Sequence, residues 1–237
     1  MSLKKYLVAT LLWSACMSST GSARSQDNPG FLFVNATVTD AEKLGVYGRA
    51  LPAVYAKYEG EYRIFGGIGR GITVLEGSAK HESVIFAEFN SLDDVEAFWW
   101  SDEYRKVFPL REGAGQFDVI GIEGTGLEPY EARDGVQPAY VFTFIKVTDR
   151  DKAMAYVEAT TDLTQNAPGR VIALARPDDY KVLEGPAPDF TIEISSWPSV
   201  SAFEDYLSDP KYIAAIPNRD AGMDLTIMIA EVPKPQQ

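Results

Sequence analysis

Two arginines that each follow a tyrosine at the same spacing are the first candidates for chemistry in this chain. Arg111 follows Tyr104 at the distance at which Arg219 follows Tyr212. A guanidinium at the mouth of a pocket can hold a carboxylate ligand through two parallel hydrogen bonds, and a phenol can donate another. The alternative, which we favour, is structural: each arginine forms an ion pair that fixes the loop before a strand, and each tyrosine ring is buried.

Two glutamates at equivalent places form the second set of candidates. Glu76 and Glu184 each lie in the tetrapeptide Val-Leu-Glu-Gly. A carboxylate whose pKa is raised there could act as a general base. The alternative that we favour is a strand end that runs into a glycine turn. The catalytic candidates are therefore Arg111, Tyr104 and Glu76.

A pair of tryptophans adds one candidate for ligand contact. Trp99 and Trp100 occupy adjacent positions of a predicted helix, so their indoles cannot share one face. We place Trp99 in the core and Trp100 at the edge of a cleft or against a neighbouring domain. The ligand-binding candidates are Arg111, Tyr104, Arg219, Tyr212 and Trp100.

Residue types that bind metals are scarce. His81 is the only histidine and Cys16 the only cysteine, so the chain lacks the ligand set of a zinc site. We expect His81 in an exposed turn, and axial haem ligation by this one residue is a minor alternative. The glycine run 66–71 leads into a strand rather than a helix, which indicates a hairpin bend instead of a phosphate loop. We predict no metal and no cofactor.

The elements that must position these residues occur twice. Besides Val-Leu-Glu-Gly, the tripeptide Val-Thr-Asp at 38–40 recurs at 147–149. A period of about one hundred residues is too long for a solenoid repeat and fits two copies of one small domain. We assign residues 29–123 to a first copy, 124–137 to a linker and 138–233 to a second copy.

Both copies show the same succession of predicted elements. Helices begin at capping boxes, formed in the first copy by Thr39 with Glu42 and by Ser91 with Asp94. Thr148 repeats the first cap in the second copy. Apolar, β-branched and aromatic runs predict the strands of the first copy at 31–38, 62–65, 72–75, 83–89 and 117–122. We interpret the succession as a βαββαβ unit, in which both helices cover one face of an antiparallel sheet.

The other face of each sheet has no helix to cover it. It carries apolar side chains, among them Phe31, Phe33, Val84 and Phe86, and would form a large exposed apolar patch. Two units can bury these faces by packing sheet against sheet. The sequence therefore predicts an α+β fold in which two antiparallel sheets pack face to face, as a pseudo-dimer within one monomeric chain.

The order of the motifs resembles the domain of unknown function 1330 family. The motifs are the Val-Thr-Asp turn, Gly66-Gly67, Val-Leu-Glu-Gly, Glu88-Phe89 at a strand end and Arg111. The second copy departs from the pattern at 175–177 and 196–197. The resemblance implies two tandem ferredoxin-like domains in the dimeric α+β barrel superfamily, fused in one chain where relatives pair as dimers. It implies no particular activity.

Composition and the N-terminus bear on partners and location. The formal net charge is -12 at pH 7, and the basic residues form no stripe, which excludes nucleic acid as an expected partner. Lys4 and Lys5 precede an apolar run at 6–16 and small residues at 21–23. The apolar run is too short to span a membrane, so this pattern predicts a signal peptide over 1–25 and a periplasmic or secreted protein. Lipid anchoring at Cys16 is the less favoured alternative.

These observations lead to one leading hypothesis and two alternatives. We expect an exported small-molecule-binding protein that holds an organic ligand between the sheet and helices of at least the first copy. The first alternative is a cofactor-independent monooxygenase-like or isomerase-like enzyme that uses the catalytic candidates. The second is a module that binds another envelope protein through its outer helices.

Overall fold

The computed structural model describes residues 28–233; the predicted signal peptide and Cys16 lie outside the described residues. The first copy contains β1 (Gly30–Val38), α1 (Ala41–Lys57), β2 (Glu61–Ile68), β3 (Gly71–Glu76), β4 (Ser83–Phe89), α2 (Leu92–Trp100), α3 (Asp102–Val107), the short 3-10 helix η2 (Phe108–Arg111) and β5 (Gly115–Glu123). The second contains β6 (Ala139–Val147), α4 (Arg150–Asn166), β7 (Arg170–Ala175), β8 (Lys181–Glu184), β9 (Thr191–Trp197), α5 (Val200–Leu207), α6 (Pro210–Gly222) and β10 (Met223–Glu231).

The helix starts follow from side-chain caps, with one shift from the sequence prediction. Ser91 caps α2 as predicted, and its Oγ accepts a hydrogen bond from the amide of Asp94 (3.1 Å). The caps of α1 and α4 are Asp40 and Asp149, each one residue later than the predicted threonine. The reason is that the aspartate side chains reach the free amides of the first turn: Asp40 Oδ1 accepts from Lys43 N (3.0 Å), and Asp149 Oδ1 accepts from Lys152 N (3.1 Å).

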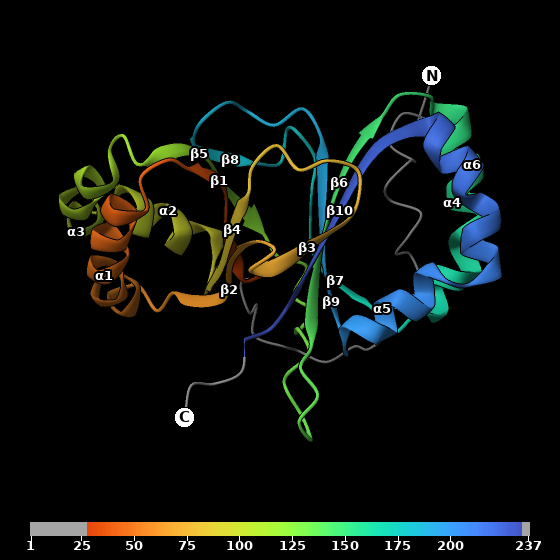
Figure 1. The fold of residues 1–237 in the computed structure, drawn as a ribbon, viewed down its shortest axis with the longest axis horizontal. Helices are drawn as coiled ribbons and strands as arrows, with labels where there is room; N and C mark the ends of the chain where they lie inside the picture. Colours follow the sequence, from red (N-terminus) through yellow and green to blue (C-terminus); the bar gives the residue numbers. More distant parts are fainter. Residues whose placement is uncertain (1–27, 234–237) are drawn as a thin grey trace, which may run out of the picture.

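Each copy builds a four-stranded antiparallel sheet, and the fifth strand crosses to the other copy. The sheets are β2-β4-β1-β5 and β7-β9-β6-β10, joined in one ten-stranded order, β7-β9-β6-β10-β3-β2-β4-β1-β5-β8 (Figure 1). Strand β3 pairs antiparallel with β10 of the second copy, and β8 pairs antiparallel with β5 of the first. Residues 72–75, predicted as a strand, thus form a strand that pairs mainly with the second copy.

Backbone conformation and edge protection explain the crossing. Gly69 and Gly71 have φ values of +74° and +90°, a region that glycine enters without steric cost. The bend therefore turns β3 away from β2, with which it shares a parallel pairing only at Gly67 and Ile68. An unpaired strand edge invites aggregation, and each crossing strand covers one edge of the sibling sheet. At the other edge, Thr125, which follows β5, donates its amide hydrogen to Ile172 O of β7 (2.8 Å). This bond links β7, the first strand of the ten-stranded order, to the end of β5 and closes the barrel.

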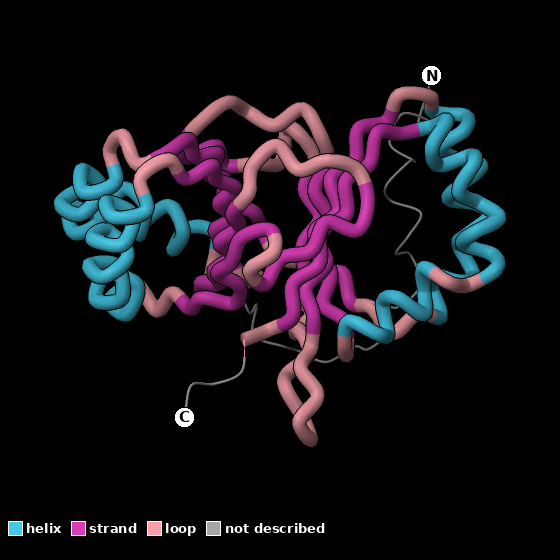
Figure 2. Tube along the Cα trace, viewed as in Figure 1, coloured by secondary structure: helices cyan, strands magenta, loops and turns pink. Residues whose placement is uncertain are grey.

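The two uncovered sheet faces bury each other, as the sequence predicts. Phe31 and Phe86 stack with ring centroids 4.8 Å apart, and Phe142 of the second copy contacts Phe86 at 5.6 Å and Phe33 at 5.5 Å. All four rings are at most 3% exposed. Figure 2 shows the resulting layers, with strands in the middle and helices outside on both sides. The prediction of a pseudo-dimeric α+β barrel is confirmed.

Candidate functional site

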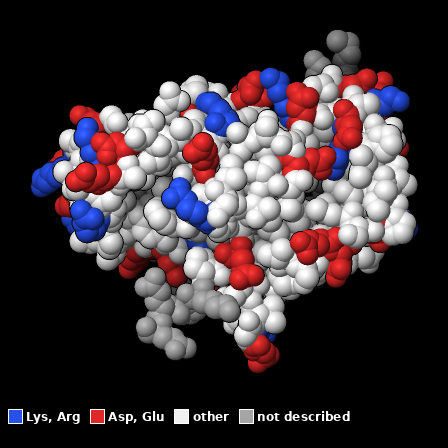
Figure 3. All heavy atoms as spheres, viewed as in Figure 1, with Lys and Arg blue, Asp and Glu red and all other residues white. Residues whose placement is uncertain are grey.

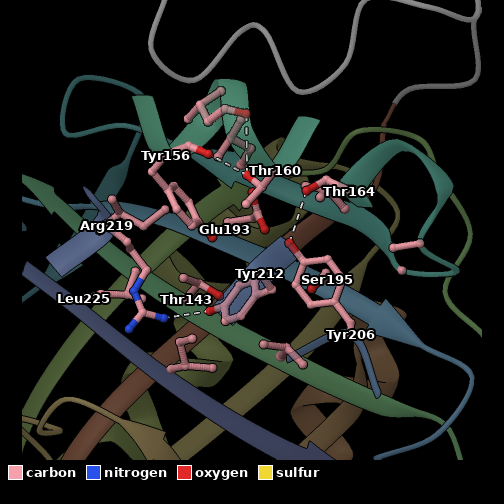
Figure 4. Close-up of a pocket in the computed structure, with 18 of the residues that line it drawn as sticks. Thr143, Tyr156, Thr160, Thr164, Glu193, Ser195, Tyr206, Tyr212, Arg219 and Leu225 are labelled. Carbon is pink, nitrogen blue, oxygen red and sulfur yellow. Dashed lines mark hydrogen bonds between the residues drawn. The ribbon is translucent and has the colours of Figure 1, made fainter. Parts of the chain in front are cut away.

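A cavity lies between the sheet and the helices of the second copy, with a volume of about 850 Å³ (Figure 4). Strands β6, β9 and β10 form its floor, and α4, α5 and α6 form its walls. The lining includes Thr143, Glu193, Ser195, Trp197, Leu225, Tyr156, Thr160, Thr164, Phe203, Tyr206, Tyr212 and Arg219. We call this space the second-copy cavity.

The same space in the first copy is filled by side chains. Only about 30 Å³ remains there, between α1, α2 and the sheet. Counted from the two N-caps, Tyr55 and Leu51 of α1 occupy the places of Thr164 and Thr160 of α4. Both larger side chains are at most 6% exposed. The cavity is therefore the volume left when small residues replace large ones. The expectation of a pocket in the first copy is wrong, because aromatic packing closes it.

Glu193 is the one acidic side chain in the lining of the second-copy cavity. It pairs with Thr143 in the β6–β9 ladder, at the register where the first copy pairs Ile85 with Val34. Within residues 28–233 its carboxylate makes no hydrogen bond and no ion pair. Burial disfavours the ionised form and raises the pKa of Glu193 to about 7. The carboxylate can therefore hold or release a proton near neutral pH.

Five aromatic rings surround the cavity. Trp197 lies edge-on to Phe203, with centroids 4.9 Å apart, and contacts Tyr206 at 5.4 Å. Tyr206 in turn contacts Tyr212 at 5.2 Å, and Tyr156 meets Tyr212 edge-on at 6.3 Å. The Tyr206 hydroxyl also lies 3.1 Å from Thr164 Oγ1. Burial is the main cause that raises the pKa of Tyr206 to about 12. These phenols are therefore neutral hydrogen-bonding groups at physiological pH.

Arg219 stands at one end of the cavity with its charge already paired. One terminal nitrogen donates to the Tyr212 hydroxyl (2.7 Å), and Nε donates to Asp220 Oδ1 (3.0 Å). The other terminal nitrogen bonds Asp220 and also Glu76, at the end of the crossing strand β3. Only 2% of the Arg219 side chain is exposed. The arginine therefore orients Tyr212 rather than presenting a free fork to a ligand.

Arg111 makes the equivalent bond in the first copy. Its guanidinium binds both carboxylate oxygens of Glu184, the last residue of β8, with one contact of 3.1 Å. We call Arg111–Glu184 and Arg219–Glu76 the cross-copy ion pairs. Burial alone would lower the pKa of Arg111. The hydrogen bonds to Glu184 and the interactions with nearby tyrosines outweigh burial and raise this pKa above its ordinary value, so the guanidinium stays charged. The repeated Val-Leu-Glu-Gly motif thus supplies each arginine with a carboxylate from its sibling.

The remaining sequence candidates are placed apart from the second-copy cavity. Tyr104 is buried in the first copy, where its hydroxyl lies 2.8 Å from that of Tyr47. Trp99 is 2% exposed, as predicted for a core residue, whereas Trp100 is 59% exposed. Trp100 lines neither cavity and carries the guanidinium of Arg105 at 4.4 Å from its ring centroid. Of the ligand-binding candidates, the structure places Arg219 and Tyr212 at the cavity.

His81 is buried rather than in an exposed turn. Its side chain is 3% exposed and lies between Thr37 Oγ1 and Asp118 Oδ2, with each ring nitrogen 2.9 Å from its partner. Burial raises the pKa of Asp118, but hydrogen bonds from Lys80 and His81 hold it below the ordinary value. Both nitrogens are engaged, so the imidazole is a structural link between β1, β5 and the loop before β4. Across residues 28–233, no group of acidic, His and Cys side chains is arranged to hold a metal ion.

Sequence reasoning missed Glu193 and the small residues of α4. A signal existed in the comparison of the two copies. An acidic residue interrupts an apolar strand where the first copy has Ile85, and Thr160 and Thr164 replace Leu51 and Tyr55. Each change places a smaller or more polar side chain on the same inner face, which is the pattern of a pocket lining.

Comparison with known proteins identifies the repeated unit. The family model described as a domain of unknown function (DUF1330) matches residues 29–125 and matches again at residues 138–233. The chain belongs to this family. The DUF1330 repeat thus accounts for both copies and for every described helix and strand. Among proteins with curated functions, none matches this chain in sequence.

Solved structures show the same fold at low sequence identity. An anthrone oxidase-like protein is 20% identical, with a TM-score of 0.51, over 89% of this chain and 93% of its own. A protein named as a candidate monooxygenase, from Fusobacterium nucleatum, is 11% identical with a TM-score of 0.50, over 88% of this chain and 94% of its own. Likeness at this level establishes the architecture of the DUF1330 pair and not its chemistry. No helix within residues 28–233 is long and apolar enough to cross a membrane.

Proposed function

We propose that this DUF1330 protein binds one small organic molecule per chain, in the second-copy cavity. The observation that carries the proposal is the asymmetry between the copies, which leave about 30 Å³ and about 850 Å³ in the same place. Ligand pockets typically measure roughly 300–1,000 Å³. A volume in this range is costly to leave unfilled in a protein interior, and a ligand supplies the missing contacts.

The chemistry of the lining supports binding of a largely apolar molecule with a few polar groups. Aromatic and aliphatic side chains form most of the wall. The polar groups are separated from one another: Glu193 lies on the floor, Thr164 with Tyr206 on one side and Tyr212 beside Arg219 on the other. Such an arrangement gives contact area from the apolar wall and orientation from the polar groups.

Filling the second-copy cavity with the side chains that the first copy carries at the same places tests the proposal. A double variant, Thr160→Leu with Thr164→Tyr, places the residues of α1 into α4 and should fill the cavity. We expect the uncharged fluorescent probe phenylnaphthylamine to bind the wild-type chain at one site and the double variant at least tenfold more weakly. Ala159→Tyr is the matched control because it adds a ring on the exposed side of α4. Equal binding by the wild type and the filled variant would contradict the proposal.

A second candidate function, a cofactor-independent enzyme, is favoured by Glu193 alone. A carboxylate whose pKa lies near 7 in an apolar cavity suits a general base at neutral pH. The names of the two structural neighbours agree with this alternative. The test is proton exchange between activated ketones and D2O, followed by NMR. The enzyme hypothesis predicts acceleration by the wild type and none by Glu193→Gln. The alternative of an envelope interaction module predicts a filled interior, which the second copy does not have.

We also propose that the protein acts outside the cytoplasm after loss of residues 1–25. The support is the basic start followed by the apolar run at 6–16. Expression of the whole chain in a bacterium, fractionation and intact mass measurement test this step. We expect a periplasmic or secreted product that begins near residue 26. A full-length cytoplasmic product would contradict export. A product that carries lipid on Cys16 would show instead that the protein is anchored to a membrane.

A further inference from the structure

We propose that the ligand of the second-copy cavity is an organic cation, with an apolar skeleton that fills the cavity and a protonated or quaternary amine that lies against Glu193. The inference rests on the proposed binding function and adds the chemical class of the ligand. It also differs from the less favoured interpretation of the sequence, in which an arginine holds a carboxylate ligand.

The first support is the carboxylate without a partner. Glu193 lies on the floor of an apolar cavity, and within the described chain no donor or cation contacts its oxygens. Glu193 is half-buried, and a carboxylate that faces an apolar cavity loses part of its hydration, so such groups are ordinarily paired. A ligand that brings a positive charge to this point supplies the missing partner. A ligand carboxylate would place a second negative charge beside the first.

The second support is that the nearby arginine is unavailable to an anion. Arg219 is bound by two carboxylates, those of Glu76 and Asp220, and by the Tyr212 hydroxyl. The Arg219 cluster therefore carries no net positive charge toward the cavity. Arg150 and Arg176 also line the cavity, and each of them interacts with other groups of the protein.

The third support is the aromatic character of the wall. Five rings from α4, β9, α5 and α6 line the cavity together with Glu193: Tyr156, Trp197, Phe203, Tyr206 and Tyr212. The face of an aromatic ring attracts a cation, and several rings around one point form the cages that recognise alkylated ammonium groups. An acidic floor under an aromatic wall is thus the complement of an amine on an apolar skeleton. In the first copy Tyr55 takes the place of Thr164, and its ring packs against Phe98 and leaves no room.

The charge of the whole molecule acts in the same direction. The chain carries a formal net charge of -12, and acidic side chains are spread over the visible face of the molecule (Figure 3). A negative surface potential raises the local concentration of small cations and lowers that of anions. This effect is general, whereas the contribution of Glu193 is local, so substitutions can separate the two.

The experiment compares three ligands of one shape: naphthylmethylammonium, naphthylmethanol and naphthoate, measured by titration calorimetry at pH 8. We expect the ammonium compound to bind at least tenfold more tightly than the alcohol, and naphthoate most weakly. Glu193→Gln should reduce the preference for ammonium over alcohol to less than threefold. Glu204→Gln is the control because it removes the same charge from an exposed position on α5 and should leave the preference intact.

The pH dependence gives an independent readout. The titratable and charged groups that line the cavity with Glu193 are the phenols of Tyr156, Tyr206 and Tyr212, whose pKa values burial raises above the ordinary value, and the guanidinium groups of Arg150, Arg176 and Arg219. None of these changes charge between pH 5 and pH 8. With a pKa of about 7, only about one Glu193 in a hundred is ionised at pH 5. The preference for ammonium over alcohol should therefore collapse at pH 5, while the amine stays charged.

The outcomes separate the inference from the function beneath it. Binding of the alcohol and the ammonium compound with equal affinity at pH 8 would overturn the cation inference and leave the proposed binding function standing. A preference that survives Glu193→Gln would also overturn the inference, because it would come from the general charge. Failure of all three ligands and of phenylnaphthylamine to bind would overturn both.

Discussion

Substitution of Glu193 should change how the stability of the ligand-free protein depends on pH. Its pKa is 4.5 in an unfolded chain and about 7 in the folded one. The folded state therefore binds the proton more tightly, and the free energy of unfolding falls as pH rises from 4.5 to 7. A shift of one pKa unit corresponds to about 1.4 kcal/mol. The ionised carboxylate thus lowers stability by about 3 kcal/mol at pH 8 and by about 1 kcal/mol at pH 5. Water inside the cavity would solvate the carboxylate, so these figures are upper values.

Glu193→Gln removes this titration and keeps the shape of the side chain. Urea unfolding at pH 5 and pH 8 gives the free energy for each protein by linear extrapolation. Relative to the wild type, the variant should gain about 2 kcal/mol more at pH 8 than at pH 5. Glu204→Gln, on the exposed side of α5, should show a constant difference. If the wild-type and Glu193→Gln curves stay parallel across this range, the carboxylate is solvated in the folded state and the argument from burial is refuted.

Four further substitutions test the packing around the site, each by urea unfolding at pH 7. Glu184→Gln should cost about 3 kcal/mol because it leaves the guanidinium of Arg111 buried without a carboxylate; Glu76→Gln should cost about 1 kcal/mol, since a second carboxylate remains on its arginine. Equal costs would show that the second carboxylate is irrelevant. Tyr55→Thr should cost about 4 kcal/mol by opening a cavity in the first copy, and a loss below 1 kcal/mol would contradict the packing comparison. His81→Leu should cost about 2 kcal/mol by leaving two polar partners unsatisfied, with ligand binding in the second copy unchanged.

The repeat and the burial of the sheets could be predicted because they depend on local patterns. The duplicated Val-Leu-Glu-Gly and Val-Thr-Asp motifs give the two copies, and apolar residues such as Phe31 and Phe86 mark a sheet face that needs a cover. The strand crossing could not be predicted in the same way. Residues 72–75 have strand composition in either arrangement, and their partner is decided by which sheet edge is free and by the angle of the glycine bend.

The ion pairs and the cavity depend on that crossing and on summed volume. Arg111 is followed in the sequence by Glu112, but its partner is Glu184, which β8 brings from the other copy. A cavity is a property of all the side chains around a space, and no single residue marks it. Position-by-position comparison of α1 with α4 would have shown Thr164 opposite Tyr55 and pointed to the second copy.

Fusion of the two copies explains how one half can keep a cavity. Opening a space of this kind costs a protein several kcal/mol of packing free energy, and in a homodimer every opening substitution would occur twice. In the fused chain it occurs once, while the filled first copy retains its rings around Tyr55 and Phe98. The crossing strand lets the first copy stabilise the second, because β3 pairs with β10 under the cavity and brings Glu76 to Arg219. That arginine holds Tyr212 in the cavity wall. The first copy therefore contributes to the site as a support, and a mutation in β3 should alter ligand binding in the second copy although β3 does not line the cavity.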